Sequence, residues 1–313
     1  MNIRIGTRGS KLALIQAQKV VDSIKAVRPN TDIEIVVIQT SGDWKPSQGE
    51  TLLSAAAGGK GLFAKEIETA LMDGRINVGV HSLKDVETFM PPELQIHHML
   101  ERDDARDALI SDKYDSIESL PQGAVVGTSS VRRGAILLSL RPDLKIVPLR
   151  GNVDTRLAKL AAGQVDATLL AVAGLERMGL LDKITQYLEP ETMLPAVCQG
   201  VIGLQIKTED TETAAILDDI HHAPTGLIAA AERALPAVLD GSCRTPIGSF
   251  AELIDDNQMR LRGLVSSPDG NNVYASEDTM TVTTIDDAIA LGTKVGHAIK
   301  NDAPQKYLDV VYA

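Results

Sequence analysis

The sequence is poor in aromatic residues, in cysteine and in long apolar runs, and each shortage narrows the class of protein. Aromatic residues make up 3% of the 313 residues, so the core must be built mainly from Ala, Val, Leu and Ile. No stretch approaches the roughly 18 consecutive apolar residues that a membrane-spanning helix needs. The two cysteines, Cys198 and Cys243, fit no zinc-binding spacing.

Basic residues are also outnumbered, with 31 Lys and Arg against 42 Asp and Glu and a net charge of −11. This balance argues against non-specific nucleic-acid binding, which needs a basic face, although it allows a local basic pocket. The segment Met1–Arg8 lacks the apolar core of a secretion signal, so we expect a cytoplasmic protein. In a reducing compartment a structural disulfide is not expected, and each cysteine is either inert or chemically active.

Short β-like runs alternate with helical periodicity over the first 220 residues. Alternation of this kind predicts an α/β protein with largely parallel sheets that are covered on both faces. The predicted strands are Ile3–Gly6, Ile33–Ile38, Val78–His81, Val125–Gly127, Lys145–Leu149 and Ala167–Leu170, and the helices lie at 17–27, 63–71, Val131–Leu140 and Val153–Leu160.

The two halves of this region have similar layouts, which predicts two lobes that face one another across a ligand-binding cleft. The stretch Ser41–Lys60 has little periodicity and many small residues, so we interpret it as a loop or lid. After about residue 221 the pattern changes to that of a smaller α+β domain. Its predicted elements are a helix from Thr225 that Pro236 ends or interrupts, strands at Ile247–Ile254, Met259–Ser266 and Val273–Thr283, and a helix at Ile285–Ile299.

Arginines recur at the predicted strand-to-helix turns. They occur in Thr7–Ser10, Thr128–Arg133 and Leu149–Arg156, and Arg177 follows a further strand. A single such arginine is usually a solvated side chain. Basic residues at a helix N-terminus oppose the helix dipole, however, so a threefold occurrence indicates an anion with several negative charges.

Three further segments could carry chemistry. His81–Asp85 ends a strand, and Asp85 is either half of an exposed ion pair with Lys84 or a cleft carboxylate that stabilises a cationic intermediate or shuttles a proton. Gly58–Phe63 lacks residues of the phosphate-loop pattern, so we reject nucleotide binding there. Cys243 lies in a turn-rich loop beside Arg244, which favours a reactive thiolate, whereas Cys198 has apolar neighbours and is expected to be inert.

Together these segments resemble the porphobilinogen deaminase (hydroxymethylbilane synthase) family of tetrapyrrole biosynthesis, along nearly the whole chain. The resemblance implies two lobes like type II periplasmic binding proteins plus a smaller domain, bounded at 1–100 with 200–218, 101–199 and 219–313. The motifs that carry it, in the family's order, are Thr7–Ser10, Gly58–Phe63, His81–Val86, Gly127–Arg133, Arg150–Arg156, Pro195–Gly200 and Gly241–Gly248.

The resemblance also implies the reaction and the site. Four porphobilinogen molecules would be joined head-to-tail, with loss of ammonia, on a dipyrromethane primer that a thioether attaches to Cys243. Asp85 would be the catalytic carboxylate. The cofactor-binding residues would be Lys84, Asp85, Thr128, Ser129, Ser130, Arg132, Arg133, Gly151 and Asn152, the substrate-binding residues Arg8, Ser10, Gln16, Phe63, Arg150, Arg156, Arg177 and Gln199, and the loop residues Asp43 and Lys60.

Some positions depart from the family pattern, and alternatives remain. Ala56 replaces a lysine, and Cys198 and Ser242 replace glycines.

We expect a monomer whose only partners are the substrate and the growing oligopyrrole, with no nucleic acid, membrane or metal. A two-lobed cytoplasmic binding protein for an acidic ligand would share the lobes and the arginines, but it leaves the third domain and Cys243 without a role. A ligand-sensing regulator would need a signalling module, which the sequence lacks.

Overall fold

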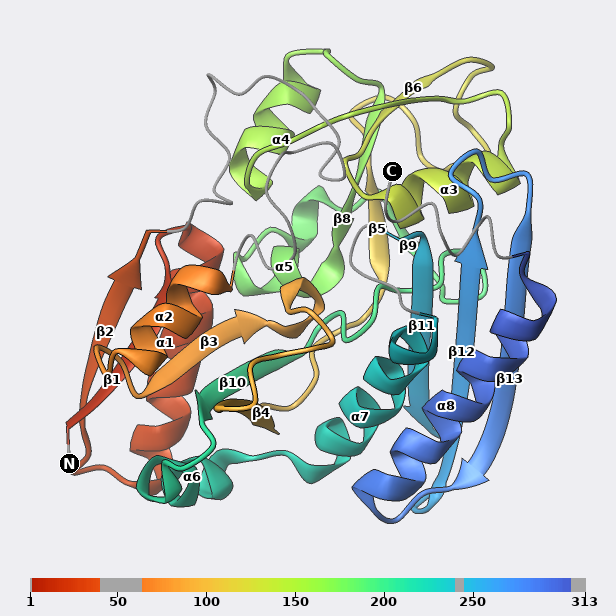
Figure 1. Cartoon of the computed structure of the whole chain (residues 1–313). Helices are drawn as coiled ribbons and strands as arrows, with labels where there is room; N and C mark the ends of the chain where they lie inside the picture. The colour runs from red at the N-terminus through yellow and green to blue at the C-terminus, as the bar shows by residue number, and fades with distance from the viewer. Residues whose placement is uncertain (1, 40–63, 240–244, 305–313) are drawn as a thin grey trace. The chain divides into compact units, whose positions relative to one another are not determined.

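The computed structural model describes residues 2–39, 64–239 and 245–304, which fall into two compact units. Unit 1 consists of the described residues of Met1–Asp43, Gly58–Asp103 and Gly200–Leu227. Unit 2 consists of those of Asp104–Gln199 and Ile228–Ala313. Each unit is built around its own five-stranded sheet, and unit 2 contains a further three-stranded sheet (Figure 1).

The sheet of unit 1 is mixed, with the strand order β2-β1-β3-β10-β4. Strand β1 runs parallel to β2 and β3, whereas β10 runs antiparallel to both β3 and β4. The expectation of largely parallel strands is therefore wrong for half of the pairings, because β10 returns from a distant part of the chain. The bounds are Asn2–Arg8 for β1, Asp32–Ile38 for β2, Val78–Ser82 for β3, Leu94–Met99 for β4 and Ile202–Lys207 for β10.

Helices cover both faces of this sheet, as predicted. Helix α1 (Lys11–Val27) buries an apolar stripe that includes Val20 and Ile24 against one face. Helix α2 (Lys65–Met72) buries Ile67 and Leu71 against the other. Short elements complete the unit: the 3-10 turn η3 at Leu83–Asp85, helix α6 at Thr211–Leu217 and the turn η5 at Asp218–Ile220.

The first sheet of unit 2 repeats this layout in the order β7-β6-β8-β5-β9, which confirms the similarity of the two halves. Strand β6 is parallel to β7 and β8, and β5 is antiparallel to β8 and β9. The strands are β5 Asp107–Ile110, β6 Val125–Gly127, β7 Lys145–Val147, β8 Ala167–Ala171 and β9 Gln186–Leu188, and the helical elements are α3 Val131–Leu140, α4 Val153–Ala161, α5 Val172–Arg177 and η4 Leu181–Lys183.

The remainder of unit 2 is an antiparallel sheet, β11-β12-β13, covered by helices. Gly263 on β12 leaves room for Leu235 of α7 and Ile299 of α8, which lie where a Cβ atom would be. Pro236 lies inside α7 and does not end it. The predicted fold class, two α/β lobes with a smaller α+β part, is confirmed. The bounds are β11 Ile247–Leu253, β12 Gln258–Ser266, β13 Val273–Thr281, α7 Ala223–Val238 and α8 Ile285–Asp302.

Candidate active site

In unit 1 the predicted polar residues lie at the carboxyl ends of two neighbouring parallel strands. Arg8 is the last residue of β1, and β3 ends at Ser82, directly before the turn that holds Lys84 and Asp85. The register pairs Gly6 with Gly79, so both strands end at the same edge of the sheet. Ligands bind at this edge in open α/β sheets. The structure therefore brings Arg8, Lys84 and Asp85 to one edge.

Helix α1 is fastened to this edge at its N-terminus. Ser10 accepts a hydrogen bond from the Ala13 N–H at 3.3 Å, which is the predicted N-cap. Gln16 is 3% exposed, and its Nε2 donates to the Ser82 hydroxyl at 2.8 Å. No acidic side chain occupies the first turn of α1, so the positive end of its dipole is not neutralised by its own sequence.

In unit 2 the loop between β6 and α3 gathers three predicted hydroxyl residues. The Thr128 N–H donates to the Val147 carbonyl at 2.8 Å, and the Ser129 hydroxyl accepts from the Leu149 N–H at 3.1 Å. Ser130 caps α3. Thr128 and Ser129 are buried, so they hold the ends of β6 and β7 in register beside the start of α3.

Arg132 and Arg133, in the first turn of α3, are buried against one carboxylate, that of Asp107. Arg132 donates to its Oδ2 at 2.7 Å, and Arg133 donates to its Oδ1 from Nη2 at 2.7 Å and from Nε at 3.1 Å. Gln199 Nε2 adds a bond to Oδ1 at 2.8 Å. Asp107, which is 0% exposed and starts β5, was not among the residues predicted from the sequence.

This cluster holds two positive charges and one negative charge in a buried space. Burial opposes the ionisation of Asp107, but the two guanidinium groups outweigh it and hold the pKa of its carboxyl well below the usual range. Burial lowers the pKa of Arg132, and the carboxylate of Asp107 partly offsets that effect. The Nε of Arg132 is buried without a hydrogen-bond partner in the described structure. Asp107 is thus part of the negative charge that the sequence predicts at this helix start. The cluster of Arg132, Arg133 and Asp107 keeps a net charge of +1.

The second arginine segment lies where β7 leads into α4. Asn152 caps α4 by accepting from the Thr155 N–H at 2.9 Å, and Gly151 has the positive φ of 113° that the turn requires. Arg156 donates from Nε to the Gly151 carbonyl at 2.9 Å. Arg150 is buried at the start of the turn. Arg177 differs from the others because it lies in the last turn of α5, where a cation suits the helix dipole.

The segment before β10 connects Gln199 to a buried glutamate. Cys198 is fully buried with a φ of 56°, a left-handed conformation that is unusual for a residue other than glycine. Its N–H donates to Glu232 Oε2 at 2.6 Å, and the Ala251 N–H donates to Oε1 at 2.8 Å. This burial agrees with the expectation that Cys198 is inert. Glu232, on α7, is a second buried acid that was not predicted from the sequence.

Comparison with protein families identifies the chain. The model described as porphobilinogen deaminase, dipyromethane cofactor binding domain, matches residues 3–215, and that of the porphobilinogen deaminase C-terminal domain matches 227–301. The chain belongs to the porphobilinogen deaminase family. Membership confirms the predicted activity, hydroxymethylbilane synthesis by a transferase, and the dipyrromethane cofactor. The binding-protein alternative rests only on likeness of fold.

Solved structures of bacterial binding domains resemble this chain more distantly. The VFT2 domain of BvgS from Bordetella pertussis is 16% identical, with a TM-score of 0.42 over 70% of this chain and 86% of that one. A putative methionine-binding lipoprotein from Bacillus subtilis is 10% identical, with a TM-score of 0.43 over 72% and 92%. A periplasmic substrate-binding protein from Coxiella burnetii is 16% identical, with a TM-score of 0.43 over 74% and 96%.

Several predicted positions lie outside the described residues. They are Cys243, Phe63, Asp43, Lys60, Ala56 and Ser242. Within the described ranges, no group of three or more His, Cys, Asp or Glu side chains is arranged to hold a metal ion. None of the helices in that part of the chain combines the length and the apolar character that a membrane crossing requires.

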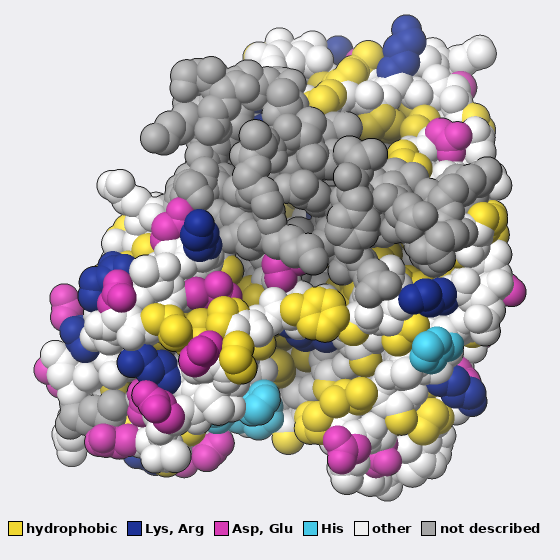
Figure 2. Space-filling view, viewed as in Figure 1, with side chains coloured by type: hydrophobic (Ala, Val, Ile, Leu, Met, Phe, Trp, Pro, Cys, Tyr) yellow, Lys and Arg dark blue, Asp and Glu magenta, His cyan; other side chains and the backbone are white. Residues whose placement is uncertain are grey.

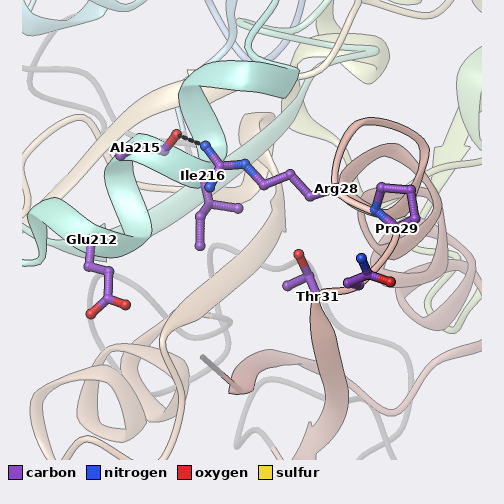
Figure 3. Close-up of a pocket in the computed structure, with 7 residues that line it drawn as sticks. Arg28, Pro29, Thr31, Glu212, Ala215 and Ile216 are labelled. Carbon is purple, nitrogen blue, oxygen red and sulfur yellow. Dashed lines mark hydrogen bonds between the residues drawn. The ribbon is translucent and has the colours of Figure 1, made fainter.

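The surface of unit 1 carries charges of both signs and a groove. On the face seen in Figure 2, basic and acidic side chains of the described residues are interspersed over unit 1. A groove of about 520 Å³ lies in unit 1 between the end of α1 and α6 (Figure 3). Arg28 in this groove donates to the Ala215 carbonyl at 2.9 Å and pairs with Asp219. Because the groove lies near the start of β2, it is remote from the edge that holds Arg8.

Proposed function

We propose that polar residues of both units take part in hydroxymethylbilane synthesis. Asp85 is the catalytic carboxylate in this proposal, and Cys243 is the attachment point of the cofactor. The buried positive excess at the start of α3 is the observation that carries this proposal. Two guanidinium groups share one carboxylate there, beside the N-terminus of a helix. A cluster of this kind favours a bound carboxylate.

The residues of this cluster fit a dipyrromethane, whose rings carry acetate and propionate groups. When bound, it supplies the terminal pyrrole ring to which new units are added. Arg132, Arg133 and the hydroxyl groups of Thr128, Ser129 and Ser130 would hold its carboxylates, together with Lys84, Gly151 and Asn152. The unpartnered Nε of Arg132 supports this role, because a buried donor gains most from a charged acceptor.

Asp85 is proposed to stabilise the positive charge that develops on the pyrrole nitrogens after ammonia leaves. A carboxylate at the strand edge acts in this way because it is fixed before the charge forms. The partial burial of the Asp85 side chain and its place directly after β3 support this role. The substrate carboxylates would be bound by Arg8, Ser10, Gln16, Phe63, Arg150, Arg156, Arg177 and Gln199, with Asp43 and Lys60 contributing from the loop.

The setting of the enzyme is also part of the proposal. A cytoplasmic location and a monomeric state are consistent with the sequence and with the small, multiply charged substrate. The proposal includes the three-domain division, 1–100 with 200–218, 101–199 and 219–313, because the strands of each of the three sheets all lie within one of these segments.

The intact mass of the purified, denatured protein tests the cofactor attachment. We expect a mass greater than that of the sequence by two pyrrole units, and an active protein of unmodified mass would contradict the proposal. Cys243→Ser should abolish the added mass. Cys198→Ser is the matched control, since its thiol is buried beside Ala229, and it should retain the added mass.

A further inference from the structure

A chain of two buried polar side chains and a half-buried one lies behind the strand edge that carries Arg8 and Asp85. His81 Nε2 lies 2.9 Å from Gln205 Oε1, and Gln205 Nε2 donates to Glu68 Oε1 at 3.2 Å. The three residues come from β3, β10 and α2, so they join three elements of unit 1. We name this chain of hydrogen bonds the His81 relay. The sequence predicts no role for this chain of hydrogen bonds, and the proposed reaction does not involve it.

The hydrogen bonds fix the polarity of the relay. An ionised carboxylate only accepts hydrogen bonds, so Gln205 must present its amide nitrogen to Glu68. Its carbonyl oxygen then faces His81, and Nε2 of the imidazole must carry the proton. In the neutral ring Nδ1 is consequently unprotonated. The carboxylate of Glu68 thus selects one tautomer of a histidine that it does not touch.

The surroundings of the ring keep it neutral. Gly79 allows this packing, because a Cβ there would lie 3.1 Å from His81 Nε2. Burial lowers the pKa of His81 to about 4, the bond to Gln205 partly opposes this, and the charge of Arg8 lowers it further. The charge of Arg8 acts on the ring from β1, whereas the carboxylate of Glu68 on α2 is linked to it through the neutral amide of Gln205.

We propose that His81 is a positioning residue. The relay holds it as the neutral Nε2–H tautomer, so that the ring adds no second positive charge next to the Arg8 guanidinium. This inference rests on the proposed roles of Arg8 and Asp85. A protonated His81 would repel the Arg8 guanidinium that binds a substrate carboxylate. It would also oppose the cation that Asp85 stabilises during the reaction. An amide between the histidine and the carboxylate prevents both effects, since a carboxylate in direct contact would favour the imidazolium.

A charge-conserving exchange tests the relay. The double variant Glu68→Gln/Gln205→Glu keeps the composition and the hydrogen-bonding capacity but moves the carboxylate against His81. The pKa of His81, followed by NMR of the holoenzyme with labelled histidine, should rise by about 1–3 units. A rise of about 3 units would leave the ring mostly charged at pH 6, so the kcat for porphobilinogen should fall there by up to about tenfold, and by less for a smaller rise, and recover at pH 8.5. A merely structural defect would not be reversed by raising the pH.

The half exchange Glu68→Gln is the matched control, because it keeps an amide against the ring. It should leave the acid limb of the kcat profile at the wild-type pH. Intact mass must first show the same cofactor load in each variant. If the double variant does not fold, Gln205→Glu alone brings a carboxylate to the same place.

Two results would overturn the proposal. In the wild-type enzyme, His81 must be the neutral Nε2–H tautomer between pH 6 and 8; a charged ring or the Nδ1–H tautomer refutes the relay. A variant that raises the pKa of His81 without changing the ratio of kcat at pH 6 and pH 8.5 refutes the positioning role. Neither result depends on how the cofactor is attached, so the relay can fail while the proposed function stands.

Discussion

Replacing Asp107 by asparagine should strongly destabilise unit 2. The carboxylate accepts four hydrogen bonds between 2.7 and 3.1 Å, three of them from Arg132 and Arg133. An amide has nearly the same shape but carries no charge, and its NH₂ group would face guanidinium donors. The variant would therefore leave two buried cations without their internal counter-ion.

The expected loss follows from this burial. Removal of one partner from a buried ion pair costs about 3–5 kcal/mol, because the remaining charge stays desolvated. For a unit of this size the loss corresponds to a melting temperature lower by about 10 °C. Thermal unfolding followed by circular dichroism measures it. Asp143→Asn is the matched control, because Asp143 accepts from Arg141 at 2.7 and 2.8 Å but is partly exposed.

The pH dependence gives a second check on Asp107. Its pKa is lower in the folded than in the unfolded state, so its contribution to stability is present above the unfolded value of about 3.9. The contribution is lost as the pH falls through the folded value. The difference between wild type and Asp107→Asn should consequently be constant from pH 5 to 8. Equal melting temperatures for Asp107→Asn and Asp143→Asn would refute this account of the cluster.

Two other substitutions test separate parts of the molecule. Glu232→Gln should lower the free energy of unfolding by about 1–3 kcal/mol, because its buried carboxylate accepts from the N–H groups of Cys198 and Ala251; urea denaturation measures this, and an unchanged midpoint would contradict it. Asp85→Asn should reduce kcat by about 100-fold or more while the cofactor mass is retained. Turnover near the wild-type rate would remove Asp85 from the chemistry.

Local sequence signals predicted much of the fold. The strands and helices on either side of the Thr128–Arg133 turn follow from apolar periodicity and capping residues, and β6 and α3 have the predicted bounds. The returning strands β5 and β10 were missed. Strand β5 has only four residues, and the polar Gln205 interrupts the apolar run of β10. Both join their sheets antiparallel, so the expectation of largely parallel sheets was wrong for the pairings that involve them.

The site could be predicted only where a residue carries its own local signal. Ser10, Ser130 and Asn152 are N-caps that their sequence neighbours identify. Asp107 has no such signal, since it lies 25 and 26 residues from its arginines and 92 from Gln199. The same is true of His81, whose partner Gln205 is 124 residues away. Buried charge pairing is decided by tertiary contacts, which a single sequence does not display.

The insertion of β10 between β3 and β4 also constrains the synthesis of the protein. Strand β4 ends at Met99, but the strand that joins it to the rest of its sheet begins only at Ile202. At a translation rate of about 5–20 residues per second, this interval lasts about 5–20 s. During that time β3 presents an open edge and β4 has no partner strand in its sheet, a condition that favours aggregation. The edge of β3 can therefore be covered by its native partner only after residues 202–207 have been synthesised.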